Sequence, residues 1–186
     1  MSDANEPGDP GRDAYLAEGN ATQARKRVAA DALIRDQEGL LLLVHPTYKA
    51  GWDLPGGMAE DNEEPTATVQ RELTEELGLG DVSIHGLLCL DWVEPHGPWD
   101  DLLAFIFDGG ALTHERVEKL SIKDGELNDF RFFPPGEALS LLPARQRARA
   151  AQALGALGDG IPRYLRNGFP VWNPSSGDPQ PEGRTS

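Results

Sequence analysis

Three glutamates, Glu72, Glu75 and Glu76, lie within five residues of one another in a segment that has the pattern of a helix. At 100° per residue they fall within an arc of about 100° on one side of that helix. Such a cluster is by default a solvated acidic face. It also has the chemistry of a metal site, because Mg²⁺ prefers carboxylate oxygens and commonly bridges to substrate phosphates. The glutamates therefore predict either a solvated face or a metal that holds a phosphorylated substrate.

The helix that positions these glutamates is predicted over residues 65–77. Pro65 suits the first turn, where its missing N–H is not needed, and Gly78 follows the last residue, as glycines that end helices do. An apolar arc lies beside the acidic one and consists of Val69, Leu73 and Leu77. One side of the helix can thus pack on a core while the carboxylates line its edge.

The glutamates belong to a longer pattern that runs from a glycine to an aliphatic residue. The pattern is G-x5-E-x7-R-E-U-x-E-E-x-G-U, where U is aliphatic, and its specified positions are met by Gly57, Glu63, Arg71, Glu72, Leu73, Glu75, Glu76, Gly78 and Leu79. With this complete Nudix box the chain resembles the Nudix hydrolase superfamily, of the MutT-like type, over roughly residues 25–140. The residues before the box are also similar to the usual lead-in of that family, namely Trp52, Leu54, Pro55 and Gly56.

The resemblance implies a mixed α/β fold, an α/β/α sandwich around a mixed β-sheet. It implies a Mg²⁺- or Mn²⁺-dependent hydrolase that cleaves the diphosphate linkage of a nucleoside diphosphate joined to another moiety. Glu72, Glu75 and Glu76 are then the expected metal ligands and catalytic residues, with Glu76 the first choice. The remaining polar and glycine positions would shape the loop and the helix without touching the metal, and they are Gly57, Glu63, Arg71 and Gly78.

A general base is needed as well, because a carboxylate must take the proton of the attacking water. In this family the base belongs either to the box or to a loop outside it. The segment before the predicted strand 130–133 offers Asp124, Glu126 and Asp129. Glu126 is the predicted base, and the alternative is that it is one more surface acid in an acidic protein.

The composition limits the partners of the chain. Its 186 residues carry a formal net charge of −14, with a pI near 4.6. This balance argues against nucleic acid polymers and anionic membranes, which need basic side chains to neutralise phosphates. A small nucleotide held through a divalent cation stays open. No apolar stretch of signal-peptide or transmembrane type is present, so a cytoplasmic location is expected.

Strands are predicted over 27–35 and 40–45, joined by the turn 36–39, and further extended segments over 52–55, 82–93, 102–108 and a last strand 130–133. Helices are predicted over 136–142 and 144–157. The domain is expected to span 25–170, between a flexible acidic tail at 1–24 and a flexible tail at 171–186. The single cysteine, Cys89, lies in an apolar run and is interpreted as a buried, inert thiol.

The substrate stays open between several interpretations. Some ADP-ribose pyrophosphatases of the Nudix superfamily, which this chain resembles, carry a proline about fifteen or sixteen residues beyond the box. Pro95 stands sixteen residues beyond Leu79, so the resemblance favours an ADP-ribose or nucleotide-sugar substrate. The rivals are a pyrophosphohydrolase of oxidised nucleoside triphosphates and, in another class, a non-catalytic nucleotide-binding sensor. The EF-hand spacing of a Ca²⁺ protein is absent.

Several side chains outside the box have no assigned role. The aromatic residues Tyr48, Trp92 and Trp99 could each stack on a base or pack the sheet. His96 could contact phosphate but is expected to be solvated. Late arginines could offset the acidic body or serve a homodimer contact, with phosphate binding the less favoured use, and they are Arg145, Arg147, Arg149, Arg163 and Arg166.

Overall fold

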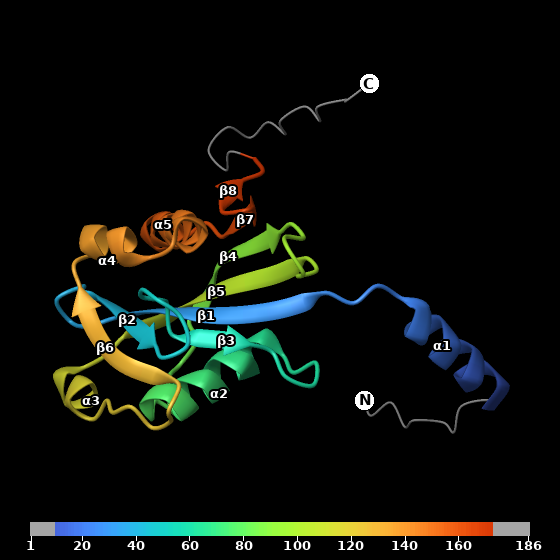
Figure 1. Cartoon of the computed structure of the whole chain (residues 1–186), viewed down its shortest axis with the longest axis horizontal. Coiled ribbons are helices and arrows are strands. Elements are labelled where there is room, and N and C mark those ends of the chain that lie inside the picture. Colours follow the sequence, from blue (N-terminus) through green and yellow to red (C-terminus); the bar gives the residue numbers. More distant parts are fainter. Residues whose placement is uncertain (1–9, 173–186) are drawn as a thin grey trace, which may run out of the picture.

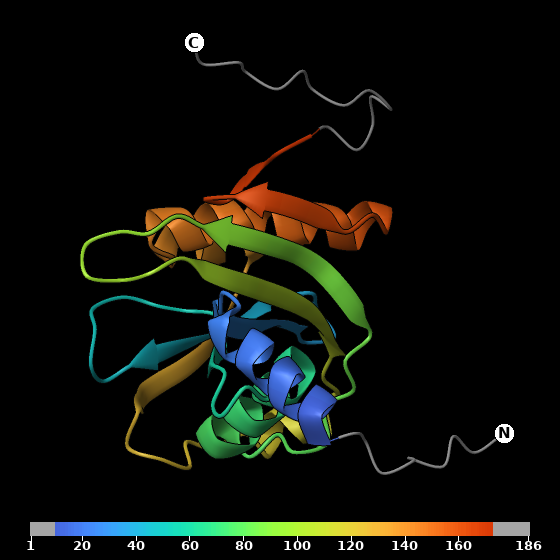
Figure 2. The ribbon, with the colours of Figure 1, turned by 90° about the vertical axis from the view of Figure 1, so that its right-hand side faces the viewer.

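A mixed β-sheet with helices on both faces forms the centre of the computed structural model, which describes residues 10–172 (Figure 1). The strands are β1 (Arg27–Arg35), β2 (Leu41–Pro46), β3 (Gly56–Met58), β4 (Gly86–Val93), β5 (Leu102–Ala111), β6 (Leu127–Phe133), β7 (Arg163–Arg166) and β8 (Phe169–Pro170). The helices are α1 (Pro10–Thr22), α2 (Pro65–Leu77), α3 (His114–Glu118), α4 (Pro135–Leu141) and α5 (Ala144–Asp159). Helix α2 covers one face of the sheet and α5 the other, as Figure 2 also shows.

The sheet order among the described residues is β6-β2-β1-β5-β4-β7-β8, with β3 paired to β1 beside this path. The pairs β1–β5 and β4–β7 are parallel, and the other pairs are antiparallel. The predicted fold class, a mixed sheet sandwiched between helices, is therefore confirmed.

Strand β1 changes partner along its length. It pairs with β2 at Arg35 and Leu41, next to the predicted turn. Nearer its start, Ala30 and Asp31 pair instead with Gly57 and Gly56 of β3. This exchange brings the glycines that lead into the box directly against β1.

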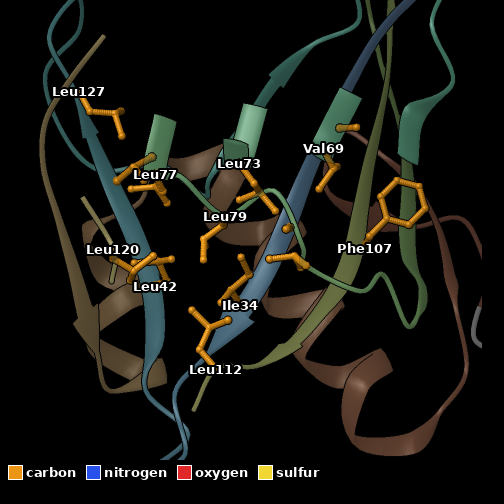
Figure 3. Packing of buried hydrophobic residues seen from close by; sticks show 14 residues of the cluster. Ile34, Leu42, Val69, Leu73, Leu77, Leu79, Phe107, Leu112, Leu120 and Leu127 are labelled. Atoms are coloured by element: carbon orange, nitrogen blue, oxygen red, sulfur yellow. The ribbon is translucent and has the colours of Figure 1, made fainter. Parts of the chain in front are cut away.

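Two apolar cores, one on each face of the sheet, follow from the strand alternation. Ala30, Ala32 and Ile34 of β1 pack toward α2, in the core shown in Figure 3. Leu33 packs on the other side, against the buried alanines of α5. The predicted apolar arc of α2 is confirmed, since its three members are fully buried in the first core and are Val69, Leu73 and Leu77. Residues of one face alternate with those of the other along a strand, so Asp31 belongs to the α5 face.

Some predicted boundaries are wrong. The strand expected over 82–93 begins only at Gly86, and the extended segment 52–55 contributes a single bridge, between Asp53 and Val44. The strand ending at Phe133 is not the last one, because β7 and β8 follow α5. The tail predicted over 1–24 contains α1, whose residues 11–22 are all exposed.

The rest of that tail, 1–9, lies outside the described residues, as do 173–186 of the predicted C-terminal tail. Within the described part of the chain, no helix combines the length and apolar character that crossing a bilayer requires.

Candidate active site

Helix α2 has the boundaries that the sequence predicts. Pro65 lies in its first turn, and Gly78 ends it in the left-handed conformation, with φ 72°. The N–H of Gly78 donates to the carbonyl of Thr74 at 3.0 Å, and that of Leu79 to the carbonyl of Leu73 at 2.9 Å. These bonds satisfy carbonyls that the helix end would leave without partners.

Glu76 is the buried member of the glutamate cluster, with 7 % of the residue exposed. Its Oε2 accepts a hydrogen bond of 3.3 Å from the backbone N–H of Gly56. Burial, followed by the nearby charge of Glu72, raises the pKa of Glu76 to about 8. Glu76 is thus held where its negative charge is poorly compensated by the protein itself.

Glu72 lies one turn earlier, against the backbone of β3. A Cβ placed on Gly57 would meet Oε1 of Glu72 at 2.2 Å, which is closer than van der Waals contact allows. The glycine therefore makes room for the carboxylate. Burial is the main cause that raises the pKa of Glu72, and the charge of Arg71 opposes it.

Arg71 ties the loop to the helix. Its Nη2 donates to Glu63 at 2.7 Å and to the carbonyl of Met58 at 3.0 Å, while its Nη1 donates to Glu75 at 3.0 Å. The hydrogen bonds from Arg71 lower the pKa of Glu63 to about 2. Glu63 and Arg71 lie where the predicted orienting role would require them.

The three glutamates line a cleft of about 290 Å³, which we call the carboxylate cleft. Asp124 and Glu126, from the loop before β6, line it together with Glu72, Glu75 and Glu76. The loop is anchored by the N–H of Thr47, which donates to the carbonyl of Glu126 at 2.7 Å. The structure thus brings the predicted base into the same cleft as the predicted metal ligands. Asp129 does not line the cleft; its Oδ2 accepts from Arg131 at 2.7 Å.

The donors of this cleft fit a hard divalent cation in chemistry. The acidic side chains of the cleft supply carboxylate oxygens, and burial, the main cause of the raised pKa values of Glu72 and Glu76, disfavours negative charge that a cation would compensate. As the side chains stand, no three carboxylate, histidine or cysteine side chains among residues 10–172 form a metal-binding group. Arg71 contacts Oε2 of Glu75 at 3.0 Å and Oε1 of Glu72 at 3.1 Å, so one oxygen of each carboxylate is paired within the protein.

A second cleft, also of about 290 Å³, adjoins the first, and its lining combines residues that the sequence analysis named with others that it did not, such as Asp31 and Asp53. We call it the Asp31 cleft. Tyr48 and the strand Gly56–Met58 line both clefts and join them. The other polar side chains that line it are Asp31, Lys49, Asp53, His96, Arg145, Gln146 and Arg149.

A buried ion pair lies at the base of the Asp31 cleft. Asp91 of β4 is completely buried, and its Oδ2 accepts from Nε of Arg149 at 3.0 Å. Its Oδ1 accepts from the backbone N–H of Gly168 at 3.0 Å. Arg149 then reaches toward Asp31, with Nη1 at 3.8 Å from Oδ2. Phosphate binding was the less favoured use of the late arginines, yet Arg145 and Arg149 line a cleft that continues from the carboxylate cleft.

The remaining residues without an assigned role divide between clefts and packing. Tyr48 is 71 % exposed at the junction of the two clefts. Trp92 donates from Nε1 to Asp101 at 2.8 Å, and the ring of Trp99 lies 4.6 Å from the guanidinium of Arg27. Cys89 is buried as predicted, and burial raises the pKa of its thiol to about 12.

Comparisons with known proteins agree with this architecture. A curated relative, CMP-5'-(N-acetyl-N-hydroxy-3-aminopropyl)phosphonate hydrolase of Streptomyces rubellomurinus, is 31 % identical over 135 residues. The match covers 69 % of this chain and 62 % of that relative. The chain thus spans less than two thirds of the length of the curated relative that it matches.

Two solved structures share the fold. The MutT protein of Methanosarcina mazei Go1 has a TM-score of 0.60 and 22 % identity, over 73 % of this chain and 99 % of that one. The NUDIX domain of NrtR from Shewanella oneidensis, solved with ADP ribose, has a TM-score of 0.61 and 20 % identity, over 81 % and 99 % of the two chains. Residues 25–154 match the NUDIX domain family, so this chain belongs to that family and carries a Nudix hydrolase domain.

Proposed function

We propose that this chain is a Mg²⁺- or Mn²⁺-dependent pyrophosphohydrolase that cleaves the phosphoanhydride between a nucleoside monophosphate and a second phosphorylated group. The observation that carries the proposal is the carboxylate cleft, where Glu72, Glu75, Glu76 and Glu126 line one cavity. Glu72, Glu75 and Glu76 would hold the cation. A bound divalent cation neutralises phosphate charge and lowers the pKa of a water at the site.

The side chains of the cleft divide the remaining work. Glu126 accepts the proton of the attacking water, whose oxygen bonds to one phosphorus while the bridging P–O bond breaks. The two phosphorylated products then leave. Arg71 holds the loop of Glu63 and the backbone of Met58 on α2, next to the glutamates that would bind the cation.

The substrate class is supported by the second cleft. A nucleoside diphosphate derivative carries a large organic group beyond its phosphates, and the Asp31 cleft provides space for such a group next to the carboxylates. The curated relative is named for the hydrolysis of a CMP-linked phosphonate, and the NrtR domain was solved with ADP ribose. Both ligands contain a nucleoside monophosphate joined through phosphorus to another group.

A substrate panel tests this proposal. We expect release of nucleoside monophosphate from ADP-ribose, CDP-linked and UDP-linked compounds in the presence of Mg²⁺, and loss of release when the metal is chelated. Oxidised dGTP serves as the competing substrate. A kcat/KM for oxidised dGTP above that of every diphosphate-linked compound would replace our proposal with a triphosphate pyrophosphohydrolase. Nucleotide binding with no turnover of any compound would instead indicate a sensor.

The role of Glu126 as the base has its own test. In Glu126→Gln, kcat is expected to fall about 10²- to 10⁴-fold, because the amide cannot take a proton. The acid limb of the pH–rate profile should change, whereas KM and the thermal unfolding temperature should change little. Glu118→Gln, at an exposed position on α3, is the matched control. A loss below about threefold in Glu126→Gln would remove Glu126 from the proposed chemistry.

A further inference from the structure

Asp31 has an unusual environment for a carboxylate. Its side chain is only 14 % exposed, and it lines the Asp31 cleft. Among the hydrogen bonds formed by residues 10–172, none has the carboxylate of Asp31 as acceptor. Its one ion-pair contact, to Nη1 of Arg149, is 3.8 Å long and exceeds hydrogen-bond distance. A carboxylate that is largely buried and has no protein donor keeps its oxygens as acceptors for water or for a ligand in the cleft.

Asp53 is a close comparison, because it lines the same cleft and its side chain is 13 % exposed. Its oxygens, however, are occupied. Oδ2 pairs with Lys49, and Oδ1 accepts from Nε2 of Gln146 and from the N–H of Leu54. Of these two carboxylates, only Asp31 keeps its acceptor capacity for something that enters the cleft.

The two cations whose charges act on Asp31 are engaged by other carboxylates, Lys49 by Asp53 and Arg149 by Asp91. The guanidinium nearest to Asp31 belongs to Arg149, which is held by the fully buried Asp91. The backbone opposite Asp31 is Gly56, where an added Cβ would meet the carbonyl of Ala30 at 2.3 Å and Cα of Asp31 at 2.7 Å. A ligand that enters from the open side of the cleft can therefore supply a donor to Asp31.

We propose that Asp31 is a specificity-determining residue that accepts a hydrogen bond from the exocyclic amino group of a nucleobase bound in the Asp31 cleft. The inference rests on the proposed function, in which the phosphates lie in the carboxylate cleft. The base then passes Tyr48, an exposed ring at the junction of both clefts on which a flat base can stack. Cytosine and adenine present an amino group where uracil and hypoxanthine present an oxygen, which an acceptor rejects.

Pairs of substrates that differ only in this group give the test. CDP-glucose is compared with UDP-glucose, and ADP-ribose with its hypoxanthine counterpart. Burial raises the pKa of Asp31 to about 7, so the comparison is made at pH 8 or above, where the carboxylate is ionised. There we expect the kcat/KM of the amino compound to exceed that of its oxo counterpart by about 10- to 100-fold, the range of one hydrogen bond to a charged group. Binding of CMP against UMP and of AMP against IMP, measured by calorimetry without metal, should show the same preference.

Two substitutions assign the preference to one carboxylate. In Asp31→Leu, which removes the acceptor at similar size, the amino-to-oxo ratio should fall to within about twofold of unity. In Asp31→Asn, which keeps one neutral acceptor oxygen, the ratio should lie in between. In Asp53→Asn, the matched control, the ratio should stay within about threefold of the wild-type ratio, whatever happens to the rate.

The outcomes separate this inference from the function on which it rests. If neither member of a pair is hydrolysed, the proposed function fails. If both members are hydrolysed and bound equally well, or if Asp31→Leu and Asp31→Asn keep the full preference, the role of Asp31 is rejected while the proposed function stands. A preference that disappears in Asp53→Asn and persists in Asp31→Leu would assign the selection to Asp53 instead.

Discussion

Replacement of Glu76 by Gln is expected to lower metal-dependent turnover by about 10²- to 10³-fold or more, with the fold intact. Glu76 is the most buried of the three predicted metal ligands, and it lines the same cleft as Glu72 and Glu75. The neutral amide of Gln removes one charged oxygen ligand from the cation. A cation at this site stabilises the charge of the transition state by several kcal/mol, so its weaker binding should slow the reaction. Single-turnover hydrolysis and Mg²⁺ titration measure the effect, and near-normal kcat would reject Glu76 as a metal ligand.

The same substitution should stabilise the metal-free protein at alkaline pH. The folded-state pKa of Glu76, about 8, lies above the ordinary value of 4.5 for a glutamate. Well below pH 4.5 the carboxyl group is protonated in the folded and in the unfolded state, so its ionisation does not lower the free energy of unfolding. As the pH rises to 8, the unfolded chain ionises first, so stability falls by an amount on the order of 2–4 kcal/mol. Glu76→Gln should remove this loss, which urea unfolding between pH 5 and 9 can measure.

Metal binding and a matched variant complete this experiment. Mg²⁺ should raise the unfolding temperature of the wild-type protein because it binds only the folded state, and it should do so much less in Glu76→Gln. Glu118→Gln, at an exposed position on α3 outside the carboxylate cleft, is the control, and its pH profile and Mg²⁺ response should match those of the wild-type protein. Equal pH profiles for the wild-type protein and Glu76→Gln would contradict the burial argument.

Most of the glutamate site could be predicted from the sequence because it is local. Helix α2 begins and ends with residues that have strong positional preferences, Pro65 and Gly78, and its apolar and acidic arcs follow from helical periodicity alone. Glu126 was a choice among three acids of one loop. The structure brings it to the cleft through the backbone bond from Thr47, a contact between segments far apart in the sequence.

The Asp31 cleft could not be predicted in this way, because its members meet only through the tertiary fold. Asp31 is one polar residue in a strand, Arg149 lies in a helix more than a hundred residues later, and Asp91 belongs to β4. Each in isolation has the ordinary appearance of a surface charge. The sequence gives one signal: Asp31 lies two residues before Leu33 in a strand whose middle is otherwise apolar, so both side chains lie on the same face of the strand.

The elements that the sequence analysis did not predict, among them β7 and α1, have weak hydrophobic patterns in the sequence. Strand β7 has four residues, of which only Leu165 is fully buried, and the parallel pairing with β4 that defines it depends on the preceding α5. Helix α1 has no packed face, since its residues 11–22 are exposed, and in Figure 1 it stands apart from the sheet. Its helical structure reflects local preference, which a composition-based prediction of a flexible tail did not weigh.

Replacement of Arg149 by Leu is expected to destabilise the fold by about 3–5 kcal/mol, a large part of the stability of an ordinary domain. Arg149 is 7 % exposed, and Asp91, which it neutralises, is fully buried. Without the guanidinium, the N–H of Gly168 is the one donor left to Asp91 among residues 10–172, and a buried charge is left uncompensated. Urea unfolding should show a lower midpoint, and the strands β7 and β8 should exchange their amide hydrogens faster, because Gly168 joins them.

The double variant Arg149→Leu with Asp91→Asn tests whether the buried charge is the cause. The amide oxygen introduced by Asp91→Asn would still accept from Gly168 but would carry no charge, so the double variant should regain more than half of the lost stability. Arg147→Leu on the same helix is the control; its guanidinium only donates to the carbonyls of Ser140 and Leu142, and its loss should cost about 1 kcal/mol. A double variant no more stable than Arg149→Leu would mean that Arg149 stabilises the fold by packing its side chain, with its charge unimportant.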